Sequence, residues 1–494
     1  MKITDATIQE VDKALVDSNN AFIKFAQSGL KVRATLMRTI AVELESLGDD
    51  LIQLAMQETN LTELRLKGER ARTMFQLSSY ADACERGEWL ELSINTADAQ
   101  RVPPKPDIRK TKYPLGPVVV FGSSNFPFAY STAGGDTASA LAAGCTVVVK
   151  AHPAHPQTSN MVANAIKTAL KKLGMDENIF IHIHGASNQV GETLVKHPLT
   201  KAVGFTGSFQ GGMALFNWAN QRHEPIPVFA EMGSVNPVYL FPEKLKEGFE
   251  VLAQQYAESI TLGVGQFCTN PGIIVGMDGK ELADFTHLLG EKISSIAAGN
   301  MLHTGIAKAY KEKSQHAIEQ QHVKLVNAAK DLQDSMRGKP MLAHVEAKHF
   351  LSNPLLSEEV FGPFSLIVSC KDISEMQAVA ASLKGQLTST LIATDQELKN
   401  NKHLVELIAS KCGRLILNGV PTGVEVCLAM QHGGPFPATT DPRFSSVGAD
   451  AIKRFARPIS FQNFSDSLLP DELKNNNPLQ IWRTVNDQLT KDAL

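Results

Sequence analysis

Apolar residues in the first 85 positions recur at the spacing of α-helices. One stripe contains Val11, Leu15, Phe22 and Phe25, and a second contains Leu36, Ile40, Leu44, Leu47 and Leu51. Residues three or four positions apart share one face of a helix, so the stripes predict amphipathic helices packed on a core. Residues 90–112 break the pattern with a polar, proline-bearing stretch (RVPPKPDIRK), for which we expect an extended arm or hairpin.

From Gly116 the chain alternates short apolar runs with amphipathic segments. The predicted strands are 117–121, 146–150, 179–184, 202–206, 226–230 and 237–241, with helices at 132–143 and 162–173. This alternation is typical of βαβ units in a parallel, doubly wound sheet. A second alternating region follows Cys268, with strands at 366–370, 387–393 and 414–417, and it predicts a second α/β domain. The tail after Phe461 is polar; we expect it to be irregular and to contact another subunit.

Composition narrows the class of protein. The 494 residues are 43% hydrophobic and 20% charged with a formal net charge of -3, so no global field favours nucleic acid or an anionic membrane. No run approaches the ~20 apolar residues of a membrane span, and the N-terminus has no secretory h-region. Six scattered cysteines form no CxxC pair, so we expect no metal site and no disulfide framework. These features predict a cytoplasmic protein.

The candidate chemistry centres on residues 262–272, LGVGQFCTNPG, where glycines and a proline surround Cys268. Such a loop holds a thiol close to a ligand without bulky neighbours, and a thiolate is well suited to attack a carbonyl carbon. The alternative is a small buried cysteine in a tight loop, which is what most cysteines are.

Four polar motifs follow predicted strands, where parallel sheets bind ligands. Gly207 and Ser208 open a helix whose N–H groups can hold a phosphate. Lys150 can bond ribose hydroxyls, Asn125 can donate to an oxyanion, and Glu231 can act as a general base. Each also has an ordinary explanation: a glycine turn, a solvated lysine, a turn-forming asparagine, an exposed carboxylate.

Together these motifs resemble the aldehyde dehydrogenase superfamily, in the family order and over almost the whole chain. The matching stretches are SNFPF at Asn125, GFTGS at Gly207, AEMGSVNP at Glu231, GQFCTNPG at Cys268 and EEVFGP at Glu359. Within the family, KAHPAHPQTS, GQFCTNPG, NGVPTGVEV and HGGPFPATTDPRFSSVG are most similar to the 2,5-dioxopentanoate (α-ketoglutaric semialdehyde) dehydrogenases and related NADP-linked bacterial enzymes.

The resemblance implies a fold class, α/β with two doubly wound Rossmann-like domains and a small oligomerisation arm. It places a cofactor-binding domain at 1–92 and 117–234, a catalytic domain at 235–445, and the arm and tail at 93–116 and 446–494. A homodimer or homotetramer follows from the family.

The resemblance also implies roles for single residues. Cys268 is the nucleophile, Asn125 and the Cys268 N–H stabilise the oxyanion, and Glu231 activates water to release the acid. The cofactor-binding residues are then Lys150, His152, Gly207, Ser208, Met232, Glu359 and Phe361.

One departure concerns the cofactor. Many NAD-preferring members carry a glutamate shortly after the lysine, and here the stretch is Lys150-Ala151-His152-Pro153. Without that carboxylate a 2′-phosphate is not repelled, and His152 can add a partner, so we expect NADP to be preferred and NAD to be accepted. His152 can instead simply shape the turn. Two further departures, Ser124 for a tryptophan and Ser234-Val235 for Gly-Lys, alter packing around the site.

The substrate is an aldehyde, and our first expectation is 2,5-dioxopentanoate oxidised to 2-oxoglutarate. Its carboxylate needs a cation, and Arg443 and His432 are candidates from the last motif. A broad-specificity or long-chain aldehyde dehydrogenase is the alternative, with an apolar tunnel lined by Phe126, Phe128, Phe267 and Phe436. Further alternatives are an acylating enzyme, a thiol esterase or a non-enzymatic binding protein on the same fold. Glu231 argues against the acylating enzyme.

Overall fold

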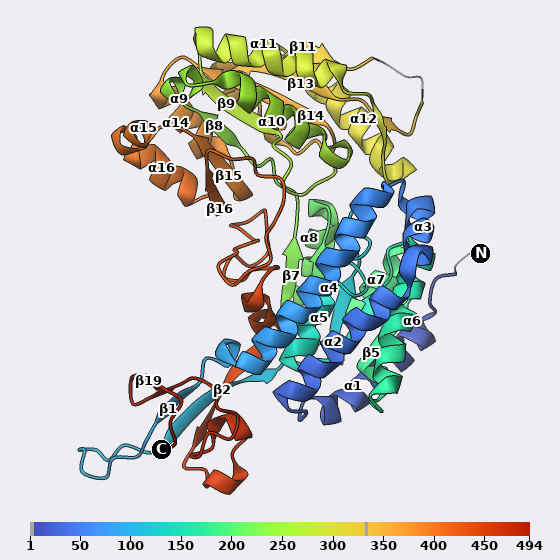
Figure 1. Cartoon of the computed structure of the whole chain (residues 1–494), viewed down its shortest axis with the longest axis vertical. Helices are drawn as coiled ribbons and strands as arrows, with labels where there is room; N and C mark the ends of the chain where they lie inside the picture. The colour runs from blue at the N-terminus through green and yellow to red at the C-terminus, as the bar shows by residue number, and fades with distance from the viewer. Residues whose placement is uncertain (1–3, 331–333) are drawn as a thin grey trace.

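The computed structural model describes residues 4–330 and 334–494 and contains three bodies (Figure 1). A lower body carries the N-terminal helices and one sheet, and an upper body carries a second, larger sheet. A small sheet extends as an arm from the lower body and lies near the C-terminus.

The sheet of the lower body has the order β5-β4-β3-β6-β7 and is parallel throughout. Its strands are β3 (Val118–Phe121), β4 (Val147–Lys150), β5 (Phe180–Ile183), β6 (Ala202–Thr206) and β7 (Val228–Glu231). Val118 and Val120 face one apolar cluster, and Val119 and Phe121 face another. Both faces are covered by helices, which is why these strands read as unbroken apolar runs. Each lies within two residues of its predicted range.

Helices cover this sheet on both sides. They are α1 (Ile8–Phe25), α2 (Leu30–Ser46), α3 (Gly48–Thr59), α4 (Glu63–Arg86), α5 (Gly135–Ala143), α6 (Pro156–Lys172), α7 (Asn188–Lys196) and α8 (Phe209–Asn220). The apolar stripes predicted in the first 85 residues are buried: Val11 and Leu15 on one face of the sheet, and Leu36 and Ile40 on the other.

The upper body holds a seven-stranded sheet of order β11-β13-β14-β9-β8-β15-β16, in which only the edge strand β11 is antiparallel. Its strands are β8 (Val238–Leu240), β9 (Ile273–Met277), β11 (Lys324–Ala328), β13 (Met341–Glu346), β14 (Phe364–Cys370), β15 (Gln386–Ile392) and β16 (Cys412–Leu417), and a separate pair is formed by β10 (Gly299–Asn300) and β12 (Arg337–Gly338).

The helices of the upper body lie on both faces of its sheet, so it too is doubly wound. They are α9 (Pro242–Lys246), α10 (Phe249–Thr261), α11 (Lys280–Ser295), α12 (Thr304–Ile318), α13 (Ala347–Ser352), α14 (Ile373–Ser382), α15 (Asp395–Asn400) and α16 (Lys402–Ala409). Short 3-10 helices are η1 (Glu88–Leu90), η2 (Glu177–Ile179), η3 (Leu262–Gly265), η4 (Pro354–Ser357), η5 (Ala449–Phe455), η6 (Asp466–Leu468) and η7 (Asp471–Leu473). The expected fold class, two doubly wound α/β bodies with an arm, is confirmed.

The arm sheet corrects one expectation. The tail after Phe461 is not irregular throughout, because β18 (Arg483–Val485) and β19 (Gln488–Thr490) complete the order β17-β2-β1-β18-β19. β2 (Ile108–Pro114) pairs along its whole length with β17 (Ala456–Gln462), and β1 (Ser93–Asn95) pairs with β18. Strands of three residues carry too little alternation to be recognised in the sequence.

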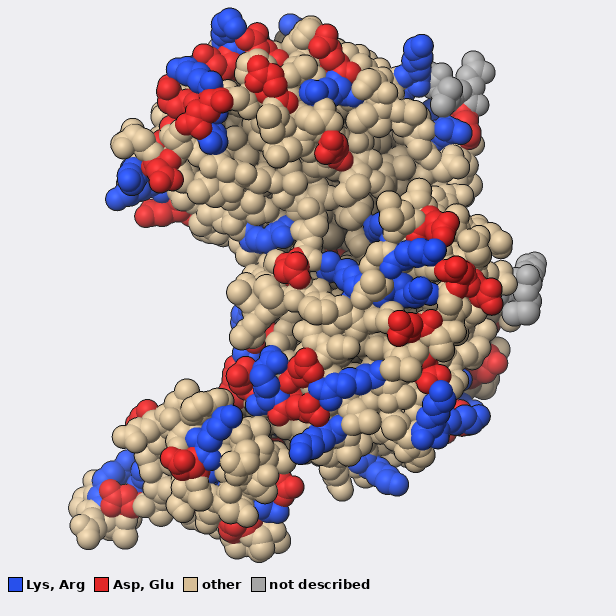
Figure 2. Space-filling model, viewed as in Figure 1, with Lys and Arg blue, Asp and Glu red and all other residues tan. Residues whose placement is uncertain are grey.

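On the face shown in Figure 2, basic and acidic side chains are interspersed over the upper and lower bodies, as the small net charge predicts. No helix within residues 4–330 and 334–494 is both long and apolar enough to cross a membrane.

Candidate active site

The loop that carries Cys268 follows η3 and is fixed by backbone contacts. Gly265 has a φ of +65°, and a Cβ there would collide with the backbone of Gly362, so only glycine lets the two segments meet. Asn236 Nδ2 donates to the carbonyl oxygens of Cys268 and Asn270, at 2.9 Å in each case. The amide thus holds the loop on both sides of the thiol.

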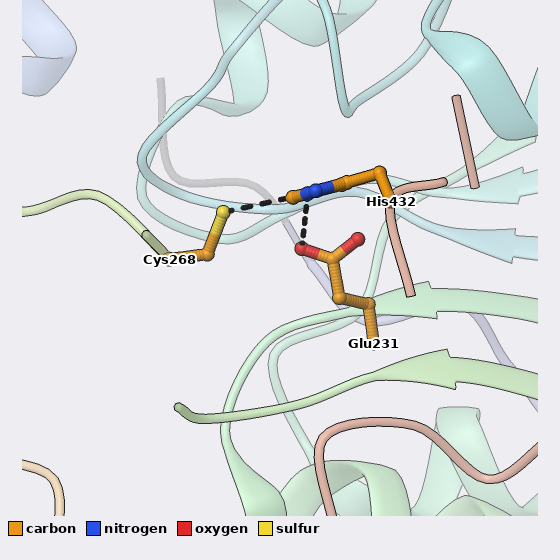
Figure 3. A group of neighbouring side chains, drawn as sticks. All are labelled: Glu231, Cys268 and His432. Atoms are coloured by element: carbon orange, nitrogen blue, oxygen red, sulfur yellow. Dashed lines mark hydrogen bonds and ion pairs between the residues drawn. The ribbon is translucent and has the colours of Figure 1, made fainter. Parts of the chain in front are cut away.

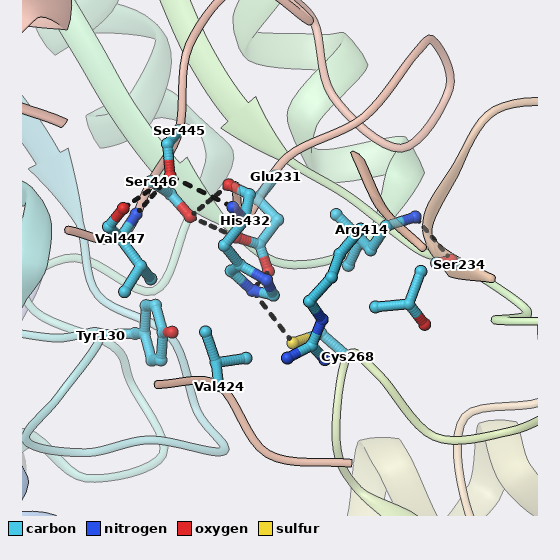
Figure 4. A network of polar contacts seen from close by, with 12 residues as sticks. Tyr130, Glu231, Ser234, Cys268, Arg414, Val424, His432, Ser445, Ser446 and Val447 are labelled. Carbon is cyan, nitrogen blue, oxygen red and sulfur yellow. Dashed lines mark hydrogen bonds and ion pairs between the residues drawn. The ribbon is translucent and has the colours of Figure 1, made fainter. Parts of the chain in front are cut away.

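Three side chains from separate parts of the chain meet at the thiol: Cys268, Glu231 at the end of β7, and His432 (Figure 3). His432 Nε2 lies 3.0 Å from Glu231 Oε1 and 3.7 Å from Cys268 Sγ. The Glu231 and His432 side chains are 3% and 1% exposed. Ser446 Oγ donates to the other carboxylate oxygen, Oε2, at 2.7 Å (Figure 4).

These contacts set the charge of the cluster. Burial opposes ionisation of Glu231, but the His432 imidazole and the hydrogen bonds from His432 and Ser446 outweigh it and hold the pKa of Glu231 below its usual value. Burial, and after it the nearby Glu231 carboxylate, raise the pKa of Cys268 well above that of a free thiol. At rest the pair is therefore a neutral thiol beside an ionised carboxylate, which is a nucleophile with a base beside it.

Asn125 lies against the same loop. Its Nδ2 donates to the carbonyl oxygen of Gln266 at 3.1 Å, and the ring of the next residue, Phe126, packs edge-on to Phe267 at 5.5 Å. An amide nitrogen carries two N–H donors, so the second remains to stabilise negative charge beside the thiol.

The residues proposed to hold a dinucleotide lie at the carboxyl ends of the lower sheet. Lys150 ends β4, its Nζ donates to the carbonyl oxygen of Gly185 at 2.9 Å, and burial lowers its pKa to about 8. Gly207 follows β6, and Ser208 caps the N-terminus of α8 by accepting from Gly211 N at 3.1 Å. A helix N-terminus with exposed N–H groups fits an anionic phosphate, so this edge suits a dinucleotide.

Glu359 and Phe361 come from the upper body and face the same edge. Glu359 Oε1 accepts from Ser234 N at 3.3 Å, and its carboxylate lies directly over Gly233, where a Cβ would overlap it. Burial raises the pKa of Glu359 to about 7. Both residues line a small pocket that also touches Phe267. Met232 N, nearby, donates to the carbonyl oxygen of Ala438 at 2.8 Å.

His152 sits in a group of histidines at this edge. Its ring centroid lies 5.5 Å from that of His155 and 6.1 Å from that of His303. Its Nδ1 accepts from Ala154 N at 3.1 Å. Burial and the neighbouring histidines and Lys150 hold the pKa of His152 well below its usual value, so at neutral pH it is an uncharged hydrogen-bonding group until an anion binds.

The comparison with known proteins decides the family. The model described as "Aldehyde dehydrogenase family" matches residues 1–436. The chain belongs to the aldehyde dehydrogenase family. It is similar over 475 residues to the alpha-ketoglutaric semialdehyde dehydrogenase 2 of Azospirillum brasilense, with 48% identity covering 96% of this chain and 90% of the relative. It is 44% identical to the alpha-ketoglutaric semialdehyde dehydrogenase of Acinetobacter baylyi, over 99% of this chain and 93% of that protein.

Solved structures support the fold of this aldehyde dehydrogenase. A Staphylococcus aureus betaine aldehyde dehydrogenase mutant matches with a TM-score of 0.80 and 18% identity, over 94% of this chain and 90% of the other. The glyceraldehyde-3-phosphate dehydrogenase of Methanocaldococcus jannaschii, solved with NADP, matches with a TM-score of 0.78 and 18% identity, over 93% and 95%. At this identity the likeness concerns the fold alone.

The structure separates the two residues that the sequence offered for the substrate carboxylate. His432 lies inside the cluster with Cys268 and Glu231 rather than at a distance from it. Arg443 is not brought to this cluster: its side chain is 79% exposed, and its Nη2 bonds to Asp441 Oδ2 at 2.5 Å.

Other side chains at the aldehyde dehydrogenase site were missed from the sequence. Ser446 bonds to Glu231, Tyr130 packs near His432 with ring centroids 6.4 Å apart, and Arg414 extends toward Cys268 (Figure 4). Ser446 lies within the distinctive stretch 432–448, so its position was a weak signal. Tyr130 lies in a turn and Arg414 in strand β16, and neither position gave a signal.

Proposed function

We propose that this aldehyde dehydrogenase oxidises 2,5-dioxopentanoate to 2-oxoglutarate through a covalent intermediate on Cys268. The observation that carries the proposal is the thiol of Cys268 set beside the ionised, buried Glu231 in a chain that is 48% identical to an alpha-ketoglutaric semialdehyde dehydrogenase over nearly its full length. The same activity in this chain is the simplest explanation of both facts.

In the first half-reaction Cys268 Sγ attacks the aldehyde carbon. Because the thiol is neutral at rest, its proton must leave as the S–C bond forms, and Glu231 with His432 is the adjacent acceptor. The carbonyl oxygen then becomes an oxyanion, which the Asn125 amide and the Cys268 N–H stabilise.

A bound nicotinamide cofactor would supply the acceptor for a hydride from the substrate carbon, and loss of that hydride would leave a thioester on Cys268. Glu231 then takes a proton from water, the water oxygen attacks the thioester carbon, and the S–C bond breaks to release the carboxylic acid. The low pKa of Glu231 keeps the base ionised at neutral pH. Lys150 and Glu359 are proposed to bond the cofactor riboses. Gly207 and Ser208 are proposed to lie near the pyrophosphate. Phe361 is proposed to lie beside the nicotinamide ribose, with Met232 nearby.

NADP is proposed as the preferred cofactor, with NAD accepted. Lys150 and His152 lie at the end of β4, and Pro153 follows where many NAD-preferring members have a carboxylate. The binding of a 2′-phosphate supplies the negative charge that would favour protonation of His152. The measurement is kcat/KM for the two cofactors at one saturating aldehyde. A preference for NAD above about tenfold, or 1.4 kcal/mol, contradicts this part of the proposal.

The substrate is tested with a panel of aldehydes: 2,5-dioxopentanoate, succinic semialdehyde, glutaraldehyde, and unsubstituted aldehydes of two to twelve carbons. We expect kcat/KM for 2,5-dioxopentanoate to exceed that for pentanal at least tenfold. A rate that rises with chain length and gains nothing from a carboxylate would instead identify a broad-specificity or long-chain aldehyde dehydrogenase. The ring centroid of Phe126 lies 5.1 Å from that of Tyr130 and 5.5 Å from that of Phe267. This group of aromatic rings favours the second candidate.

We also propose that the arm and tail, residues 93–116 and 446–494, mediate assembly into a homodimer or homotetramer. The arm sheet projects from the lower body (Figure 1) and ends in the edge strands β17 and β19. An unpaired strand edge offers N–H and C=O groups to another chain. Light scattering of the full chain gives the mass, and a monomer at micromolar concentration contradicts the proposal.

A further inference from the structure

A guanidinium group, that of Arg65, contacts Phe126 and Phe267, the two residues next to Asn125 and Cys268. The Arg65 Cζ atom, on α4, lies 4.3 Å from the ring centroid of Phe126 and 4.6 Å from that of Phe267. These rings directly follow Asn125 and directly precede Cys268. Arg65 Nη2 also donates to the carbonyl oxygen of Asn125 at 3.1 Å. Arg65 is thus in contact with both sides of the reaction centre.

Arg414 approaches the thiol from β16 in the upper body (Figure 4). Burial lowers the pKa of its guanidinium below the usual value. Its Nη1 and Nη2 donate to the carbonyl oxygens of Gly423, at 2.9 Å, and Pro421, at 2.6 Å. Each of these nitrogens carries a second N–H, and the buried Nε has no hydrogen-bond partner.

Arg72 lies about two helical turns beyond Arg65 on α4 and completes the group. It donates through Nη1 to the carbonyl oxygen of Val424 and through Nη2 to Tyr130 Oη at 3.3 Å, and its buried Nε is likewise without a partner. Arg72 and Arg414 therefore hold one loop, 421–424, from opposite bodies. That loop lies in the stretch NGVPTGVEV, which the proposed chemistry has left without a role.

The positive charge of this group is only partly balanced by protein carboxylates. Within residues 4–330 and 334–494, neither Arg72 nor Arg414 has a carboxylate within 4.0 Å, and Arg65 has only Glu69, at 3.5 Å. Glu69 is itself bound by the N–H groups of Phe128 and Ala129. A poorly solvated cation without a counter-charge is costly, so the group is poised for an anion supplied by a ligand.

We infer that Arg65 and Arg414, with Arg72 supporting them, bind the carboxylate of the aldehyde substrate while Cys268 attacks its far end. This inference rests on the proposed function and names the residues that select its substrate. In 2,5-dioxopentanoate four C–C bonds of about 1.5 Å separate the carboxylate carbon from the aldehyde carbon, a reach of about 5 Å. The cation must therefore lie close to the thiol. Arg65 stacks on Phe267, the residue before Cys268, and Arg414 extends toward Cys268 (Figure 4), whereas Arg443 is exposed and paired with Asp441.

The test compares one charged and one neutral substrate of the same length, 2,5-dioxopentanoate and pentanal, in Arg65→Gln, Arg414→Gln and Arg414→Lys. A charge-assisted hydrogen bond contributes enough that each glutamine variant should lose about 10- to 100-fold in kcat/KM for 2,5-dioxopentanoate, mainly through KM. The loss for pentanal should be smaller, so that the ratio of kcat/KM for 2,5-dioxopentanoate to kcat/KM for pentanal falls at least tenfold, and the remaining turnover of pentanal shows that the variant is folded and that its thiol is active. Arg414→Lys should recover part of the loss. Arg86→Gln, in the exposed last turn of α4, is the matched control.

Two outcomes overturn the inference. Equal losses on both substrates mean that the arginines act only on structure, and a selective loss in Arg443→Gln but not in the other two means that the carboxylate binds elsewhere. The proposed function fails separately, when the wild type does not prefer 2,5-dioxopentanoate. In that case the anion site is tested by measuring how fast iodoacetamide alkylates Cys268 with and without glutarate. Protection by glutarate that is seen in the wild type and disappears in Arg414→Gln supports the anion site. Absence of protection in the wild type rejects it.

Discussion

The Nε2 atom of His432 lies 3.0 Å from Oε1 of Glu231, and both side chains are almost fully buried. The same nitrogen is 3.7 Å from the Cys268 thiol. An imidazole in this position changes the carboxylate from a group that burial would protonate into one that is ionised at neutral pH. The base and the nucleophile are therefore coupled through one histidine.

Removal of the base should separate the two half-reactions. In Glu231→Gln the thioester should still form, although more slowly because only His432 remains to take the thiol proton, and it should hydrolyse more slowly still, because no carboxylate takes a proton from water. We expect kcat to fall by about 10²- to 10⁴-fold, while a burst approaching one equivalent of reduced cofactor per active site remains in stopped-flow absorbance. Glu224→Gln, at an exposed site, is the control. A variant that shows no burst yet keeps steady-state turnover would contradict this role.

Removal of the imidazole should move the pH profile. In the wild type the pKa of Glu231 is below its usual 4.5, so its stabilising contribution is present above pH 4.5 and is lost as the pH falls through the lower folded-state value. In His432→Asn burial dominates, the carboxyl pKa rises, and the acidic limb of kcat should shift to higher pH. Ser446→Ala, which removes one hydrogen bond, should give a smaller shift in the same direction. The measurement is kcat between about pH 4.5 and 8, and an unmoved acidic limb would exclude the coupling.

The same three side chains should make the enzyme sensitive to zinc. One ligand atom from each of Glu231, Cys268 and His432 lies within 4.8 Å of the others. Tetrahedral Zn²⁺ with bonds of about 2.3 Å to sulfur and 2.0 Å to nitrogen places those atoms about 3.6 Å apart, and here they are 3.7 Å apart. We expect Zn²⁺ to inhibit reversibly, with activity restored by a chelator.

Cobalt offers a direct readout of this ion. Co²⁺ should give a sulfur-to-metal charge-transfer band that persists in Cys427→Ser, which lacks the exposed thiol, and disappears in Cys268→Ser. A band that disappears in Cys427→Ser and persists in Cys268→Ser would place the ion at Cys427 instead. The ion is an inhibitor in this prediction and takes no part in catalysis.

Glu359 should make cofactor affinity depend on pH. Its pKa is raised to about 7 by burial, and an ionised carboxylate accepts ribose hydroxyls better than a neutral one. NAD affinity should therefore increase as the pH rises from 6 to about 7.5, with the gain levelling off above the pKa. In Glu359→Gln the affinity should be weaker and flat over this range. Fluorescence titration measures it, and a wild-type curve that falls with pH would contradict the assignment.

Much of the fold follows from local pattern. β3 and β4 are runs of valine buried on both faces, so composition alone predicts them. The ends of α1 and α4 are similarly evident, because Thr7 and Thr62 accept from the first-turn N–H groups. Strand ends differ by a residue or two from their predictions because the last residues of a strand depend on the neighbouring strand rather than on their own pattern.

The site is a different matter, because its residues meet only through long-range packing. Cys268 and Glu231 were evident from motifs whose chemistry is local. The contact of His432 with both depends on where a loop more than 160 positions later crosses the end of β7, and no periodicity encodes that crossing. The role of Arg65 was not evident from the sequence, because an arginine in a helical stretch is usually a solvated side chain. Only the structure shows that its guanidinium packs on Phe126 and Phe267.

The parallel pairing of β1 with β18 joins residue 93 to residue 484. A growing chain can complete the lower sheet once residue 231 has emerged, but the arm sheet lacks β17, β18 and β19 until residue 490 has emerged. The arm sheet is therefore completed after the lower sheet during biosynthesis. A ribosome-bound fragment that ends before residue 456 contains only β1 and β2 of the arm sheet, so it lacks both of the edge strands that are proposed to mediate subunit assembly.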